Sequence, residues 1–227
     1  MKRLALGALC ALALASTGQA ATFTYTGSPF TNVMPYSGGC PTGVCANFTT
    51  SMRVTGSITT SAPLAPNLAN QDVTAQVTAY SFSDGVNTFA SSDPNVKLYY
   101  PFMATTDASG NLTAMGFLVN IWETGTTNSH AGGDRLSNLA VAATGAVSYN
   151  DIPCATVGVS PTGAADSCTF GGAFDNDISY ALTMAAGTWA STGNTSAVPT
   201  LSQWGTALLA LTLSIVAGFG FRAGRQR

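Results

Sequence analysis

Basic residues are scarce in this sequence. Only eight of its 227 residues are lysine or arginine, and five of these eight lie in the first three or the last six positions. Residues 21–197 carry three basic side chains against ten acidic ones, a net charge of −7. Because nucleic acids and anionic lipid surfaces are bound through clusters of lysine and arginine, no nucleic-acid partner is expected.

Histidine and glutamate each occur once, as His130 and Glu123. Zinc sites need several imidazole or thiolate ligands, and glycoside hydrolysis needs a pair of carboxylates. His130 has Ser129 beside it and Asp134 four residues on, but a catalytic triad is defined by geometry, and the GxSxG nucleophile elbow is absent. We therefore expect a polar loop histidine and no enzyme.

Two binding chemistries stay open as alternatives. Asp175 and Asp177 in FDNDIS are ordinary turn residues, but calcium also favours loop carboxylates, so no cofactor is predicted and calcium is the alternative. Exposed aromatic rings would make a platform for sugars. The alternating strands in which most of them lie favour core packing instead. The aromatic residues concerned are Tyr99, Tyr100, Phe102, Trp122 and Trp189.

The first twenty residues have the order of a secretory signal peptide. Lys2 and Arg3 form a basic start, residues 4–15 are apolar, and a small-residue cleavage site of the form Gly18-Gln19-Ala20 follows. The sequence therefore predicts export through the Sec translocon and cleavage by signal peptidase between Ala20 and Ala21.

Four cysteines remain after that cleavage: Cys40, Cys45, Cys154 and Cys168. An even number in an exported chain favours disulfides. Of the three pairing schemes that four cysteines allow, the one with two local bonds is the simplest. Cys40 with Cys45 and Cys154 with Cys168 would each close a loop rich in glycine or proline.

Apolar and polar residues alternate along residues 21–189, as in ATFTYTG, where Phe23 and Tyr25 share one face. No amphipathic helix is recognisable. This pattern predicts an all-β fold, an antiparallel β-sandwich or jelly-roll-like ectodomain. Strands are expected within residues 21–27, 48–59, 72–83, 86–92, 96–106, 112–123, 136–143, 146–151 and 177–190.

The clearest local unit is a hairpin of residues 96–106 and 112–123, joined by DASGN. The second strand is apolar on both faces, which indicates a position inside a sheet. Residues 61–71, with two prolines, are expected to cross between sheets. Residues 190–197 (ASTGNTSA) are expected to form a linker.

The C-terminal segment 198–227 begins with VPTLSQWG, residues 198–205. Residues 201–221 carry no charge, and as a helix they would be about 31 Å long, enough to cross a bilayer. Arg222, Arg225 and Arg227 form a basic end at residues 222–227, which places the C-terminus in the cytoplasm and the ectodomain outside.

This order of motif, span and basic end resembles the IPTL-CTERM tail, IPTLxxWG, a relative of PEP-CTERM tails. Val198 stands where the motif has isoleucine. The matching residues are Pro199, Thr200, Leu201, Trp204 and Gly205. The resemblance implies a Gram-negative bacterium, an exosortase-type sorting enzyme as partner, and removal of the tail. The precursor would be held in the inner membrane by its helix. The product would go to the cell surface, outer membrane or extracellular matrix.

The sequence thus predicts an exported surface or matrix protein of undefined molecular activity. One alternative is a carbohydrate- or calcium-binding surface module with a surface polysaccharide as partner. Another is a plain single-pass membrane-anchored protein, in which the same span is a permanent anchor.

Overall fold

The computed structural model describes residues 19–40 and 44–192. These residues form strands joined by loops and one short 3-10 helix, η1 (Thr74–Gln76). The strands are β1 (Ala21–Thr26), β2 (Asn32–Met34), β3 (Thr55–Thr60), β4 (Gln71–Asp72), β5 (Val77–Ser83), β6 (Thr88–Ala90), β7 (Val96–Thr106), β8 (Leu112–Trp122), β9 (Arg135–Ala142), β10 (Gly145–Gly158), β11 (Ser167–Gly171), β12 (Ser179–Thr183) and β13 (Thr188–Thr192).

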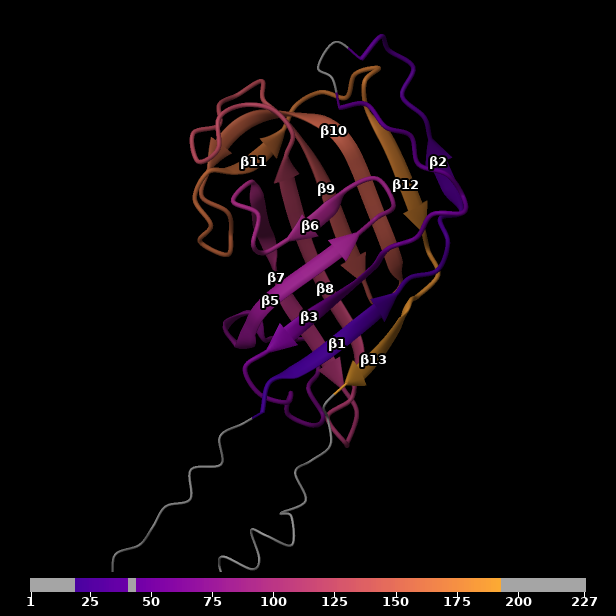
Figure 1. The fold of residues 1–227 in the computed structure, drawn as a ribbon, viewed down its shortest axis with the longest axis vertical. Coiled ribbons are helices and arrows are strands. Elements are labelled where there is room, and N and C mark those ends of the chain that lie inside the picture. Colours follow the sequence, from indigo (N-terminus) through magenta and orange to yellow (C-terminus); the bar gives the residue numbers. More distant parts are fainter. Residues whose placement is uncertain (1–18, 41–43, 193–227) are drawn as a thin grey trace, which may run out of the picture. The chain divides into compact units, whose positions relative to one another are not determined.

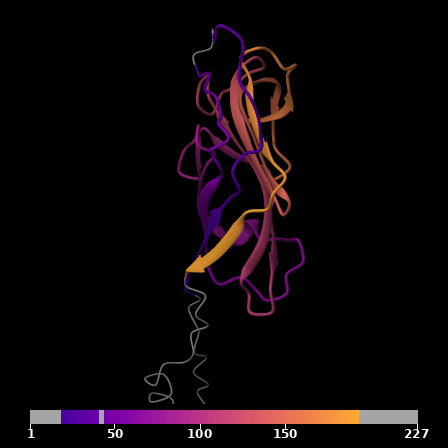
Figure 2. The same ribbon diagram turned by 90° about the vertical axis from the view of Figure 1, so that its right-hand side faces the viewer.

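The strands make two antiparallel sheets. A five-stranded sheet has the order β13-β1-β3-β5-β6, and an eight-stranded sheet has the order β2-β12-β10-β9-β8-β7-β4, with β11 paired to β10. In Figure 1 the first sheet lies in front of the second and its strands cross those behind at an oblique angle. Figure 2 shows the two layers edge-on. The predicted all-β, antiparallel fold is confirmed, and its two layers form a sandwich.

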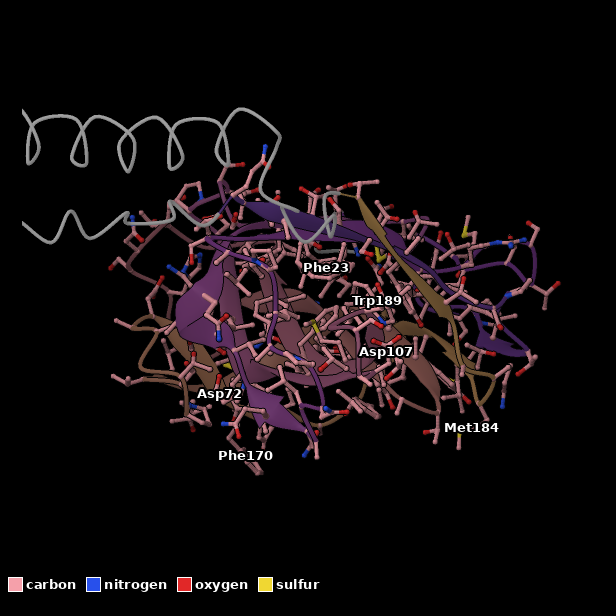
Figure 3. The ribbon with its side chains drawn as sticks, turned by 90° about the horizontal axis from the view of Figure 1, so that it is seen from below. Phe23, Asp72, Asp107, Phe170, Met184 and Trp189 are labelled. Carbon is pink, nitrogen blue, oxygen red and sulfur yellow. A yellow bond between two sulfur atoms is a disulfide. The ribbon has the colours of Figure 1, made fainter. Side chains whose placement is uncertain are left out.

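The main core fills the space between the layers. In β1 the side chains of Ala21, Phe23 and Tyr25 are buried, while the threonines between them are partly or fully exposed. Phe82 of β5 packs against Phe117 of β8 with ring centroids 4.5 Å apart, which joins the two sheets. Figure 3 shows Phe23 and Trp189 in this space. Each fully buried phenylalanine stabilises the fold by roughly 1.5–3 kcal/mol through removal of apolar surface from water.

A smaller apolar cluster lies on the other face of the eight-stranded sheet. Val119 of β8 belongs to the main core, and Trp122, three residues on, points to the opposite face because side chains alternate along a strand. β10 continues past a register shift between Tyr149 and Ile152 and pairs with β11. The cluster consists of Trp122, Leu136, Ile152, Cys154, Cys168 and Ile178.

Several predicted features are confirmed. β7 and β8 form the predicted hairpin, and the carboxylate of Asp107 in its turn accepts hydrogen bonds from the backbone N–H groups of Ser109 and Asn111. β8 lies between β7 and β9, inside its sheet as its two apolar faces indicated. Residues 61–71 lead from β3 in one sheet to β4 in the other.

Other strand predictions were wrong in extent. Residues 48–54 precede β3 rather than belong to it, and η1 separates β4 from β5 within the predicted strand 72–83. The predicted strand 177–190 is two strands, β12 and β13, which belong to different sheets. β10 runs seven residues beyond the predicted end at Asp151, because pairing with β11 supplies hydrogen bonds that the local sequence does not announce.

Residues 190–192 of the predicted linker belong to a strand. β13 extends to Thr192, and Ala190, Ser191 and Thr192 pair with β1 in register. The segment 190–197 therefore starts as an edge strand, because alternation of exposed and half-buried side chains continues through residue 192. Residues 193–197 lie outside the described residues.

Candidate functional site

Both local disulfides are present. Cys40 is bonded to Cys45 and Cys154 to Cys168, each with a Cα–Cα distance of 5.7 Å. The second disulfide links strand residues of β10 and β11, whereas the sequence placed both cysteines at the ends of a loop. It therefore links the two strands of the hairpin within the smaller apolar cluster, to which both cysteines belong.

His130, the only histidine of the sequence, is buried between Trp122 and Asp166. The ring of His130 stacks on the indole of Trp122, with centroids 4.3 Å apart and planes 5° from parallel. Its Nδ1 lies 2.7 Å from Oδ2 of Asp166, and its backbone N–H donates to Oδ1 of the same carboxylate. Only 1% of the His130 side chain is exposed. The histidine fastens the β8–β9 loop to the β10–β11 hairpin.

The prediction of a polar loop histidine is thus correct in its location, but it did not identify the residue that bonds to the ring. Neither candidate triad neighbour bonds to the ring of His130: Asp134 accepts a hydrogen bond from the backbone of Ala131. Asp166, the residue that does bond, is 36 positions away in sequence, so no local spacing pointed to it. Partial burial raises the pKa of Asp166, but the hydrogen bonds from His130 and the charge of Lys97 outweigh it, and the pKa is lowered.

Arg135 holds two carboxylates at the start of β9. Its Nη1 and Nη2 bond to the two oxygens of Asp175 at 2.7 and 2.9 Å. Its Nε lies 3.0 Å from Oδ1 of Asp151, whose side chain is fully buried. The hydrogen bonds from Arg135 lower the pKa of Asp175, an effect that its partial burial opposes. The arginine therefore neutralises charge inside the fold.

The two candidate calcium residues differ in their partners and their exposure. The carboxylate of Asp175 faces Arg135, and Asp177 is buried, with its backbone N–H donating to Asp175. Within residues 19–40 and 44–192, no group of three or more histidine, cysteine, aspartate or glutamate residues is arranged to hold a metal ion.

A second buried carboxylate bridges the layers. Asp84, in the β5–β6 turn, accepts hydrogen bonds from the backbone N–H groups of Val86 and Asn87 and from the hydroxyl of Ser148 in β10. Asn87 in turn donates to Asn150, which lies two residues beyond Ser148. Burial raises the pKa of Asp84 despite these hydrogen bonds.

The five aromatic candidates separate into two groups. Phe102 and Trp122 are buried, and Trp189 is half-buried and packs on the main core. Tyr100 is 54% exposed, and its ring touches that of Tyr99 at 5.5 Å. The predicted core packing therefore holds for Phe102, Trp122 and Trp189, whereas Tyr99 is half-buried and Tyr100 is exposed.

The predicted signal peptide, sorting motif, membrane span and basic end lie outside the described residues, apart from the cleavage position. Ala20 and Ala21 are described, and β1 begins at Ala21. In the described part of the chain, no helix is both long and apolar enough to span a membrane.

Residues 196–227 match the family model described as the IPTL-CTERM motif. The match spans the whole predicted tail, so the chain carries an IPTL-CTERM sorting tail, which relates it to the substrates of exosortase-type enzymes. Such a tail indicates an exported protein. A search of curated proteins and a search of solved structures each gave no match.

Proposed function

We propose that this chain is an exported surface or matrix protein whose tail is recognised and removed by an exosortase-type membrane enzyme. The observation that carries the proposal is the IPTL-CTERM match at residues 196–227. It begins four residues after the last described strand ends at Thr192. The folded body would thus be separated from the processing site by a very short connection.

The order of events follows from the chemistry of the two ends. The Sec translocon passes the chain outward, and signal peptidase cuts between Ala20 and Ala21, which leaves β1 at the new N-terminus. The apolar segment 201–221 then holds the precursor in the inner membrane until the tail is cut. The two disulfides are consistent with this route, because such bonds persist in oxidising compartments.

We propose a structural or adhesive role for the body, without catalysis or a cofactor. Three of the five acids with shifted pKa values support this proposal, because each is hydrogen-bonded to a side chain from another segment of the fold. Asp84 is bound by Ser148, Asp166 by His130, and Asp175 by Arg135. Each of these hydrogen bonds joins two separate segments of the fold, which is a structural use of the acid.

Substitutions in the tail test the proposal. The variant with Pro199→Ala and Trp204→Ala should accumulate in the inner membrane, while the unchanged chain reaches the surface. Ser202→Ala is the matched control, because the motif IPTLxxWG leaves that position unspecified. Membrane fractionation with protease treatment of intact cells measures both. Surface delivery of the double variant at the level of the control would show that the segment is a plain anchor.

A further inference from the structure

A cleft of about 520 Å³ opens at the edge of the eight-stranded sheet, where β4 ends beside β7. Its volume falls within the range of small-ligand pockets, roughly 300–1,000 Å³. The lining residues are Asp72, Thr74, Ala75, Pro101, Pro161 and Thr162.

The cleft is open because, beyond β4, no strand of the described residues pairs with this edge of β7. Side chains make the hydrogen bonds to its backbone instead. β4 pairs with β7 at two positions only. Beyond them, the N–H of Phe102 donates to Oγ1 of Thr74 at 2.9 Å, and the carbonyl of Leu98 accepts from Oγ1 of Thr162 at 2.6 Å. Pro101, between these two caps, has no N–H to satisfy. The hydrogen bonds of the β7 backbone at these positions are therefore made by side chains, and the space beside the strand stays open as the cleft.

Two β-bulges bracket the same stretch. The register of β7 on β8 shifts between Leu98 and Tyr100 and again between Tyr100 and Met103. Bulges re-aim side chains and are frequent beside binding sites. Tyr100 lies between the two shifts, directly precedes the cleft residue Pro101, and is 54% exposed. The ring of Tyr99 packs against the ring of Tyr100 with the centroids 5.5 Å apart. The hydroxyl of Tyr99 donates a hydrogen bond to the carbonyl of Thr169.

The polar groups of the cleft suit hydroxyl ligands. Oδ1 of Asp72 accepts from the N–H of Thr74, and Oδ2 has no hydrogen-bond partner among the described residues. Thr74 uses its oxygen as an acceptor, so its hydroxyl hydrogen can donate. A pocket that combines one carboxylate, one hydroxyl donor and an exposed tyrosine at the next position in the chain matches a sugar, which has several hydroxyls and an apolar C–H face.

Charge narrows the class of sugar. Residues 21–197 carry a net charge of −7, and the one charged group lining the cleft is Asp72. Anionic polymers would be repelled from this surface. We propose that the cleft and Tyr100 bind a neutral polysaccharide: Asp72 accepts hydrogen bonds from sugar hydroxyls, and the Tyr100 ring packs on the face of the same or the next sugar.

Affinity electrophoresis of the full chain tests this binding without reference to the fate of the tail. The chain is purified in a polyoxyethylene detergent, which has no sugar head group, and run in native gels that contain dextran, galactomannan or hydroxyethylcellulose. Alginate serves as the anionic polymer. At least one neutral polymer should retard the chain, and alginate should not.

Two variants locate the site. Tyr100→Ala and Asp72→Asn should each raise the dissociation constant derived from the gel retardation about tenfold or more. The asparagine keeps an oxygen for the N–H of Thr74, so the local turn is retained. Met184→Ala is the control, because Met184 is 72% exposed and lies far from Asp72 in Figure 3. Absence of retardation by every neutral polymer, or retardation that neither site variant changes, would overturn the proposal.

Discussion

The guanidinium of Arg135 and the carboxylate of Asp175 form a two-pronged ion pair, with N–O distances of 2.7 and 2.9 Å. The same guanidinium reaches Asp151, whose side chain is fully buried. Asp175, in contrast, has 42% of its side chain exposed. One arginine thus compensates a buried charge and also fixes the β11–β12 loop.

Replacing Arg135 with alanine should destabilise the fold strongly. Asp151 would then lose the guanidinium that lies 3.0 Å from its Oδ1, and removing one member of a buried ion pair costs about 3–5 kcal/mol. Asp175→Asn should cost no more than about 1 kcal/mol, because that carboxylate is partly solvated. Urea denaturation of the detergent-purified chain, followed by tryptophan fluorescence, compares the two. Equal losses would mean that Arg135 does not compensate Asp151.

The stability of the fold should pass through a maximum at mildly acidic pH. Burial raises the pKa of Asp84 and of Glu123, so their contribution is complete below the unfolded values, 3.8 and 4.5, and is lost as pH rises through the folded values. Asp166 and Asp175 have lowered pKa values, so their contribution is present above 3.8 and is lost as pH falls through the folded values.

Asp84→Asn isolates the first of these effects. The amide oxygen can still accept from the backbone of Val86 and Asn87, but the position no longer titrates. Unfolding free energies measured from pH 7 to pH 3 should therefore rise less on mild acidification than in the unchanged chain. An identical pH profile in the variant would exclude Asp84 as a source of the dependence.

The two disulfides should differ in their contributions to stability. Replacing Cys154 and Cys168 with alanine opens the longer loop and should cost about 3 kcal/mol, whereas replacing Cys40 and Cys45 should cost about 2 kcal/mol. Denaturant midpoints of the two double variants measure the order. Mass spectrometry without reduction should find no alkylated cysteine in the mature body, and alkylation at any of the four positions would contradict the pairing.

Calcium should not bind to the segment that contains Asp175 and Asp177. The Arg135 guanidinium occupies the first carboxylate, and the second is buried. Calorimetric titration with millimolar calcium should give no binding heat. A saturable signal that Asp175→Asn abolishes would restore the calcium-binding alternative.

Local patterns in the sequence were sufficient to predict much of the fold. Alternation located β1, the DASGN turn gave the β7–β8 hairpin, and short spacings gave both disulfides. The parts that were missed depend on contacts between distant residues. β11 is defined by its pairing with β10, and the end of β10 follows from the same pairing.

The candidate sites follow the same rule. The tail motif is contiguous and could be found in the sequence, and the family match agrees with it. Asp166 lies 36 positions from His130, and Asp175 lies 40 positions from Arg135. The cleft is assembled from β4, η1, β7 and the β10–β11 loop. These residues are far apart in the sequence and come together only when the two sheets fold. No local spacing could therefore predict their contacts.

The most direct test of the account is the intact mass of the protein recovered from the cell surface or the surrounding matrix. Processing at both ends predicts a body that begins at Ala21 and lacks Arg222, Arg225 and Arg227. A mass that corresponds to residues 21–227 would contradict it, because the C-terminal helix would then be a permanent anchor.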